Sequence, residues 1–228
     1  MVIGRVVYAC DVGSTRGSAP RFSWVRLEPT RLNGRISAYS SLPALIDSIG
    51  QDMEKGHNIA LGFEAPLFIP VPRDVSDLSR GRVGEGNRPF SSQAGLAVAT
   101  LAIHQAAWIL MMLRSFKNTG HVFTSAIESW PPLGATRTLF CWEAFVSGQA
   151  HSDSHARDAA NAAYYFCQHE VDLANVNAVT GENPFSLISA VAIWSGWTND
   201  IASLHKPTLV LKPTHGLPHD IVVDQRRI

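Results

Sequence analysis

The sequence has little charge and few cysteines. Charged residues make up 17% of the 228 residues, and 19 Lys and Arg balance 19 Asp and Glu, so the formal net charge is zero. A neutral chain lacks the overall field that attracts nucleic acid or anionic lipid, so a polyanion must be bound by a local patch. The three cysteines, Cys10, Cys141 and Cys167, have no paired C-x-x-C spacing and indicate neither a disulfide framework nor a structural zinc site. A reducing cytoplasm is the expected location.

The chain nevertheless has enough apolar residues for one substantial core. Hydrophobic residues make up 46% of it, which excludes a disordered chain, and 228 residues suit one large domain with an elaborated edge. The N-terminus reaches Asp11 before a signal-peptide apolar region is complete, so we expect no leader. The membrane-like run at 94–113 contains Thr100, His104 and Gln105 and is rich in alanine. We therefore expect a buried helix of a soluble core and no membrane partner.

The first part of the sequence predicts three antiparallel strands and a helix. Residues 4–10 are nearly all apolar, as in a strand buried on both faces, and further strand patterns cover 21–27 and 35–40. Asn33-Gly34 between the last two is a strong hairpin signal. Apolar residues at helical spacing then predict a crossover helix over 42–55.

The rest of the chain predicts alternating helices and strands. Further strands are expected at 57–64, 120–128 and 208–211, and helices at 94–113, 136–146, 156–168 and 185–197. Residues 70–92 hold four arginines among glycine, proline and serine, which predicts a long loop. We expect an α/β fold with a mixed sheet, in which residues 1–170 form the core and residues 171–228 form a C-terminal, partly helical extension packed on it.

Acidic residues stand where three of these strands end. Asp11, Glu64 and Glu128 occupy those positions, and Asp158 lies in the first turn of a later helix. Because ligands collect beyond the carboxyl ends of parallel strands, these acids are predicted to share one cleft. Unpaired carboxylates repel one another unless a hard divalent cation such as Mg²⁺ or Mn²⁺ neutralises them. The pattern predicts a metal-assisted phosphoryl-transfer site.

Each acid also has a purely structural interpretation. Asp11 could cap the turn at Gly13, Asp158 could interact with the helix dipole, and Glu128 could pair with an arginine of the long loop. Glu64 is harder to explain in this way, because a buried carboxylate before Ala-Pro needs a partner. The common position of the acids at strand ends favours function.

Five short motifs follow one another in the chain. They are Asp11 after the first strand, Phe63-Glu64-Ala65-Pro66, Glu85-Gly86-Asn87-Arg88-Pro89-Phe90, Glu128-Ser129-Trp130-Pro131, and Arg157-Asp158-Ala159-Ala160-Asn161-Ala162. In this order they resemble the ribonuclease-H-like superfamily, and within it a family of predicted RNase-H-like nucleases related to the Holliday-junction resolvases. The resemblance covers roughly residues 4 to 170, and its weight lies in the order of the motifs.

The resemblance implies a two-metal nuclease that hydrolyses phosphodiester bonds of DNA or RNA, with Mg²⁺ or Mn²⁺ as its cofactor. Asp11 would bridge both ions, Glu64 would complete one site and Asp158 the other, with the ions ~3.5–4 Å apart. Resolvase-like sequences carry two acids three residues apart on the late helix, whereas this chain has Asp158 and the neutral Asn161. The residues that could compensate are Glu128, Asp153 and His155.

Candidate substrate contacts lie in two loops. Arg82 and Arg88 of the long loop could bind phosphates, although acids in the same loop partly balance them. Ser14 belongs to Asp11-Val12-Gly13-Ser14-Thr15, which is similar to the first phosphate loop of actin-like ATPases and sugar kinases. His151 and His155 are expected to be solvated loop residues, and His155 is also a candidate general base.

Three functions stay open on the sequence. A metal-dependent nuclease is favoured by the acids, and a non-catalytic binding module by Asn161 and the neutral charge. An actin-like phosphotransferase ranks lower, since the chain has no second Asp-Gly-Gly-like loop. The sequence does not distinguish a DNA, RNA or branched substrate, nor a monomer from a homodimer.

Overall fold

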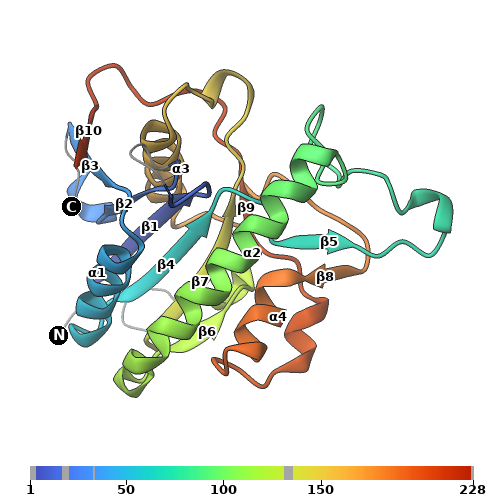
Figure 1. Cartoon of the computed structure of the whole chain (residues 1–228), viewed down its shortest axis with the longest axis horizontal. Coiled ribbons are helices and arrows are strands. Elements are labelled where there is room, and N and C mark those ends of the chain that lie inside the picture. The colour runs from blue at the N-terminus through green and yellow to red at the C-terminus, as the bar shows by residue number, and fades with distance from the viewer. Residues whose placement is uncertain (1–3, 17–20, 33, 131–135, 227–228) are drawn as a thin grey trace.

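A mixed sheet forms the centre of the molecule. The computed structural model describes residues 4–16, 21–32, 34–130 and 136–226. Within these residues the main sheet has eight strands: β1 (Arg5–Asp11), β2 (Ser23–Leu27), β3 (Arg35–Tyr39), β4 (Asn58–Phe63), β6 (Val122–Thr124), β7 (Thr138–Ala144), β9 (Val210–Leu211) and β10 (Val222–Arg226). Their order is β10-β3-β2-β1-β4-β7-β6, with β9 beside β7. The sheet is mostly parallel, which confirms the predicted α/β class (Figure 1).

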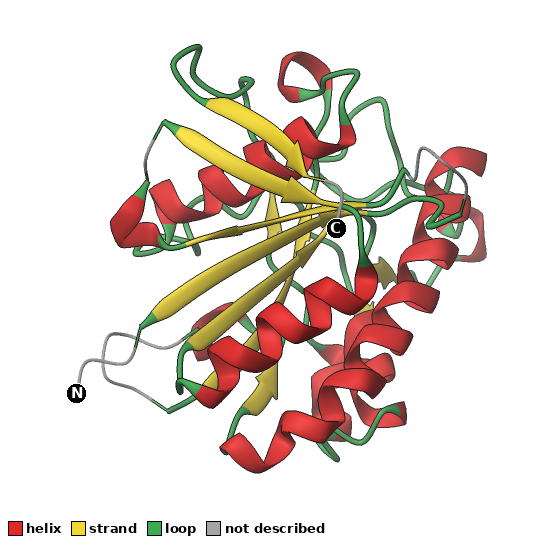
Figure 2. Cartoon of the chain, turned by 60° about the vertical axis from the view of Figure 1, so that its left-hand side comes forward, coloured by secondary structure: helices red, strands yellow, loops and turns green. Residues whose placement is uncertain are grey.

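Four α-helices cover the two faces of this sheet within the described residues (Figure 2). They are α1 (Leu42–Glu54), α2 (Gln93–Leu113), α3 (His155–His169) and α4 (Leu187–Trp194). The core between α1, α2 and the sheet contains Val6, Tyr8 and Cys10 of β1, whereas the core under α3 contains Val7 and Ala9. Because side chains alternate along a strand, Asp11 at the end of β1 lies on the α3 side.

The first three strands pair as predicted. β2 lies antiparallel to β1, with Cys10 opposite Trp24, and antiparallel to β3, with Trp24 opposite Tyr39. Asn33 of the predicted hairpin turn lies outside the described residues. The crossover helix α1 begins after Ser41, whose side chain accepts a hydrogen bond from the Ala44 amide, and leads into β4.

The long helix α2 packs along one side only. With the turns that follow it, Gln93–Thr119 is long and apolar enough to cross a membrane by length and composition alone. In the structure it packs against α1, α4 and the sheet, and it buries Ala99, Ala102, Gln105, Ala106, Ile109, Leu110 and Leu113. The helix therefore covers one face of the sheet.

The prediction of a helix at 136–146 is wrong. These residues contain β7, which lies between β4 and β6 and is buried along its whole length. A strand buried on both faces of a parallel sheet is a continuous apolar run, which periodicity does not distinguish from a buried helix. The predicted strand at 120–128 is also shorter, because β6 ends at Thr124 and Glu128 lies in a 3-10 turn.

The C-terminal residues join the main sheet. β9 lies parallel to β7, and β10 lies parallel to β3, at the edge of the sheet. A second, two-stranded sheet consists of β5 (Phe68–Pro70) and β8 (Pro184–Ser186), which lie beside α4 (Figure 1). Residues from 171 onward thus pair with strands from the first, middle and last parts of the predicted core.

We predict that Gly62→Ala destabilises the protein by about 1–3 kcal/mol, because overpacking forces neighbours to shift. A Cβ atom on Gly62 of β4 would lie 2.4 Å from the ring of Trp142, which is fully buried. Chemical denaturation measures the effect. The matched control is Gly216→Ala, whose nearest heavy atom would lie 3.8 Å away. Equal stability of the two variants would contradict the prediction.

Candidate metal centre

The centre begins with two acids on adjacent parallel strands. Asp11 is the last residue of β1, and Glu64 follows β4 directly. The strands are in register with Cys10 opposite Phe63, and the Glu64 amide donates a 2.8 Å hydrogen bond to the Cys10 carbonyl oxygen. Asp11 and Glu64 are the next positions in this register. Their carboxylates therefore come together at the carboxyl edge of the sheet.

The third acid comes from the helix that covers this edge. Asp158 lies in the first turn of α3, which is capped by the side chain of Ser154. The amide and hydroxyl of Ser152 each donate a 2.8 Å hydrogen bond to Asp158 Oδ1. Asp11, Glu64 and Asp158 each offer one carboxylate oxygen, and these oxygens all lie within 4.8 Å of one another. The structure thus brings together the three predicted metal ligands.

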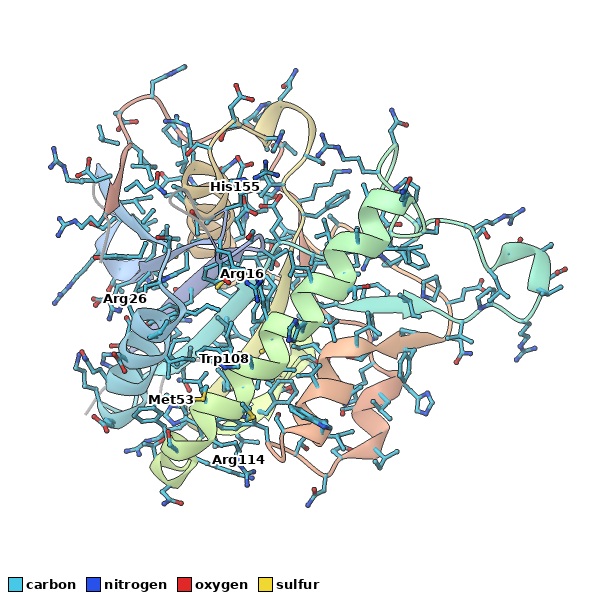
Figure 3. The ribbon with its side chains drawn as sticks, viewed as in Figure 1. Arg16, Arg26, Met53, Trp108, Arg114 and His155 are labelled. Carbon is cyan, nitrogen blue, oxygen red and sulfur yellow. The ribbon has the colours of Figure 1, made fainter. Side chains whose placement is uncertain are left out.

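Two histidines contact this acidic cluster. His151 Nδ1 lies 2.7 Å from Asp158 Oδ2, and His155 Nδ1 lies 2.8 Å from Asp11 Oδ2. Figure 3 labels His155 at the start of α3, where β1 and β4 end. Both side chains are nearly half exposed, as expected for solvated residues, but His155 is the first residue of α3 and not a loop residue, and each histidine contacts an acid. The signal in the sequence is their spacing, four residues apart beside the first turn that carries Asp158.

Burial makes the charged cluster costly. It raises the pKa of Asp11 from 3.8 to about 6, although the neighbouring His155 lowers it. Burial also raises the pKa of Glu64 well above its usual value, and the charges of Asp11 and Asp158 raise it further, whereas Arg88 opposes the shift. Among the described residues, Glu64 Oε2 is buried and has no hydrogen-bond partner. An unpaired carboxylate oxygen on a residue that lies close to two other acids fits a hard divalent cation.

Asn161, at the position of the expected second helix acid, uses its amide nitrogen in two hydrogen bonds. Its side chain is buried, and Nδ2 donates to the carbonyl oxygens of Ala150, at 3.1 Å, and His215, at 3.0 Å. These bonds join α3 to the loop that precedes it and to the C-terminal segment. A carboxylate cannot donate either bond, which explains why an amide stands here and not a second helix acid.

Two predicted site residues lie elsewhere. Glu128 is exposed, does not belong to the acidic cluster, and has Lys206 Nζ 3.5 Å from its Oε1. Arg82 is buried, with its guanidinium 2.8 Å from Glu85 and 2.6 Å from Glu143. Arg82 is therefore paired with acids inside the protein. The expected phosphate contact of Arg82 is wrong, and its role is a structural ion pair. The sequence does not reveal this ion pair, because Glu143 lies on β7, which the sequence pattern predicts to be a helix.

The other two predicted substrate contacts stay accessible. Arg88 is exposed and lines a cavity together with Glu64. Ser14 is exposed in the loop after β1 and lines a different cavity, on the side of α2, with Arg16 and Trp108 (Figure 3). Arg88 is therefore the predicted arginine that lies beside the acidic cluster.

Comparisons of the chain with protein-family models, curated proteins and solved structures found no match. The chemistry must therefore be argued from the site. The site contains three carboxylates, two histidines and one exposed arginine. The carboxylates could hold a divalent cation, and the arginine could contact a phosphate.

We predict that Asp11→Asn stabilises the metal-free protein at about pH 7, by roughly 1–3 kcal/mol. The folded-state pKa of Asp11 is raised, so its contribution to stability is fully present below the unfolded pKa and is lost as pH rises from about 4 to about 6. The gain from the substitution should therefore grow over this range and then level off. Thermal unfolding of both proteins in EDTA across that pH range measures the gain in stability. A gain that does not depend on pH would contradict the raised pKa of Asp11.

We also predict that Asn161→Asp destabilises the protein by about 2–4 kcal/mol, because a buried carboxylate would face two carbonyl oxygens. The loss should shrink at low pH, where a protonated carboxyl can donate one hydrogen bond. Urea unfolding at neutral and acidic pH tests both statements. Unchanged stability at neutral pH would show that the two bonds contribute little.

Proposed function

We propose that this protein is a metal-dependent nuclease of the RNase-H-like kind, which hydrolyses phosphodiester bonds in DNA or RNA. The observation that carries the proposal is the convergence of Asp11, Glu64 and Asp158 with an unpartnered, buried carboxylate oxygen on Glu64. A cluster held only for stability would pair its charges. Here the acids come from two strands and a helix and meet at the edge where ligands bind in α/β sheets.

The fold supports the same proposal. The sheet starts with three antiparallel strands, β1 to β3, and continues on the other side of β1 with the parallel strands β4 and then β7. This is the arrangement that the ribonuclease-H-like resemblance implies. The late helix that resembles the family motif is α3, which carries Asp158 to the ends of β1 and β4.

The residues present fit Mg²⁺ or Mn²⁺, which prefer carboxylate oxygens. Asp11, Glu64 and Asp158 would hold the ion or ions. When bound, such ions neutralise the carboxylates, polarise the phosphate and lower the pKa of water. The two histidines and Ser152 hold the carboxylates in place: His155 and Ser152 form hydrogen bonds with Asp11 and Asp158, and His151 Nδ1 lies 2.7 Å from Asp158 Oδ2.

His155 can also move a proton. With Asp11 ionised, His155 Nδ1 donates to its Oδ2, which leaves Nε2 of the neutral ring as an acceptor. In this role Nε2 takes a proton from the attacking water as its oxygen forms a new bond to phosphorus. The P–O bond to the leaving strand breaks, and the leaving oxygen takes a proton from solvent water. Arg88, exposed beside Glu64, binds a non-bridging phosphate oxygen.

Calorimetric titration of the purified protein with Mn²⁺ and Mg²⁺ tests the centre before any substrate is chosen. We expect Asp11→Asn and Glu64→Gln to weaken binding by more than the roughly 10–100-fold that loss of an outer-shell partner costs. Glu128→Gln is the matched control, because this acid is exposed and outside the cluster. It should bind as the unchanged protein does.

The same titration separates the alternatives. Binding that both substitutions abolish supports the nuclease and justifies a cleavage screen with single-stranded, duplex and branched nucleic acids. No binding at millimolar metal, even with nucleic acid present, would overturn it and favour a non-catalytic binding module. A parallel titration with ATP covers the third alternative. Binding of ATP without binding of metal would favour a nucleotide-binding phosphotransferase.

A further inference from the structure

A cavity of about 460 Å³ adjoins the metal centre. Its walls come from the ends of β4 and β7, the loop before α2 and the first turns of α2, and Glu64 belongs both to these walls and to the acidic cluster. We call it the side cavity. An occupant of the side cavity would touch the metal centre directly. Its size falls in the ~300–1,000 Å³ range of pockets that enclose small molecules.

The lining of the side cavity is mostly apolar. Its apolar lining includes Pro66, Pro89, Phe90, Val98 and Phe145. Arg82, Glu85 and Glu143 also contribute to the lining, but they are buried and pair with one another. Asn87 and Arg88 are exposed. The interior thus offers flat apolar contact and no free positive charge, whereas Arg88 offers a cation at the edge.

We propose that the side cavity binds one unpaired nucleobase of a single-stranded nucleic acid, whose adjacent phosphate lies at the metal centre. This inference rests on the proposed function and adds the substrate class. Aromatic and apolar walls suit the face of a base, which stacks without sequence preference. A phosphate does not suit the interior, because Glu64, Glu85 and Glu143 line it and the buried Arg82 is already paired. Arg88 suits the neighbouring phosphate.

An occupied side cavity requires a base outside the helical stack. A duplex must unstack and unpair a base to fill it, whereas a single strand need not, so single strands should bind more tightly. The neutral chain points the same way, because a duplex binder relies mainly on many phosphate contacts with cationic side chains. Binding through one base and one arginine should therefore depend only weakly on salt.

The test uses two substitutions on the exposed side of α2. Val98→Trp places an indole in the side cavity, and Leu96→Trp adds the same ring at a more exposed position that does not line it. Fluorescence anisotropy measures binding of short labelled oligothymidine, oligouridine and a duplex of the same length. Titrations run in Ca²⁺ and in EDTA, and calorimetry with Mn²⁺ alone checks the metal centre of both variants.

We expect at least about a tenfold preference for single strands over duplex, and about a tenfold or greater loss in Val98→Trp but not in Leu96→Trp. The two single strands show whether the sugar matters. If Mn²⁺ binds normally but duplex binds as tightly, or both variants behave alike, the side cavity proposal is overturned and the proposed nuclease stands. If Mn²⁺ does not bind, the nuclease fails. The EDTA titrations then decide on the side cavity by the same comparison of variants.

Discussion

Repulsion among three closely spaced carboxylates, two of them buried, is the constraint around which this end of the molecule is organised. Asp11 and Glu64 are forced together by the parallel register of β1 and β4, and α3 adds Asp158. The surrounding groups offset part of the cost: the Ser152 amide and hydroxyl, His151 and His155 all bind carboxylate oxygens. Glu64 retains a buried oxygen that has no partner among the described residues, so the protein's own groups compensate these charges only in part.

The same edge of the sheet shows a second way to handle buried acids. Glu143 on β7 lies beside Phe63 of β4, one residue before Glu64 in the chain, and points to the opposite side. There Arg82 binds both Glu143 and Glu85, and the Leu67 amide donates to Glu143 as well. The protein's own arginine thus neutralises one group of acids, whereas the neighbouring group keeps a carboxylate oxygen without a partner.

The sequence alone predicts much of the acidic cluster of Asp11, Glu64 and Asp158. It predicts nothing of the ion pairs that Arg82 forms with Glu85 and Glu143. Asp11 and Glu64 follow apolar runs that are typical of parallel strands, and their proximity follows from that topology. β7 is also mostly apolar, and periodicity alone does not distinguish a short buried strand from a buried helix, so its pattern also fits a helix. With β7 misassigned, Arg82 looks like a free loop cation. The contacts of His151 and His155 depend on how α3 docks, which no local pattern encodes.

The pairing of β10 with β3 has a consequence for how the protein is made. Residues 222–226 complete a sheet whose partner strand, 35–39, leaves the ribosome long before them. Until then the free edge of β3 exposes unpaired backbone groups, which are a template for pairing with another chain. Growing chains must keep that edge apart from their neighbours during synthesis. Arg35, which pairs with Asp224 in the finished protein, puts a positive charge on this edge in the meantime.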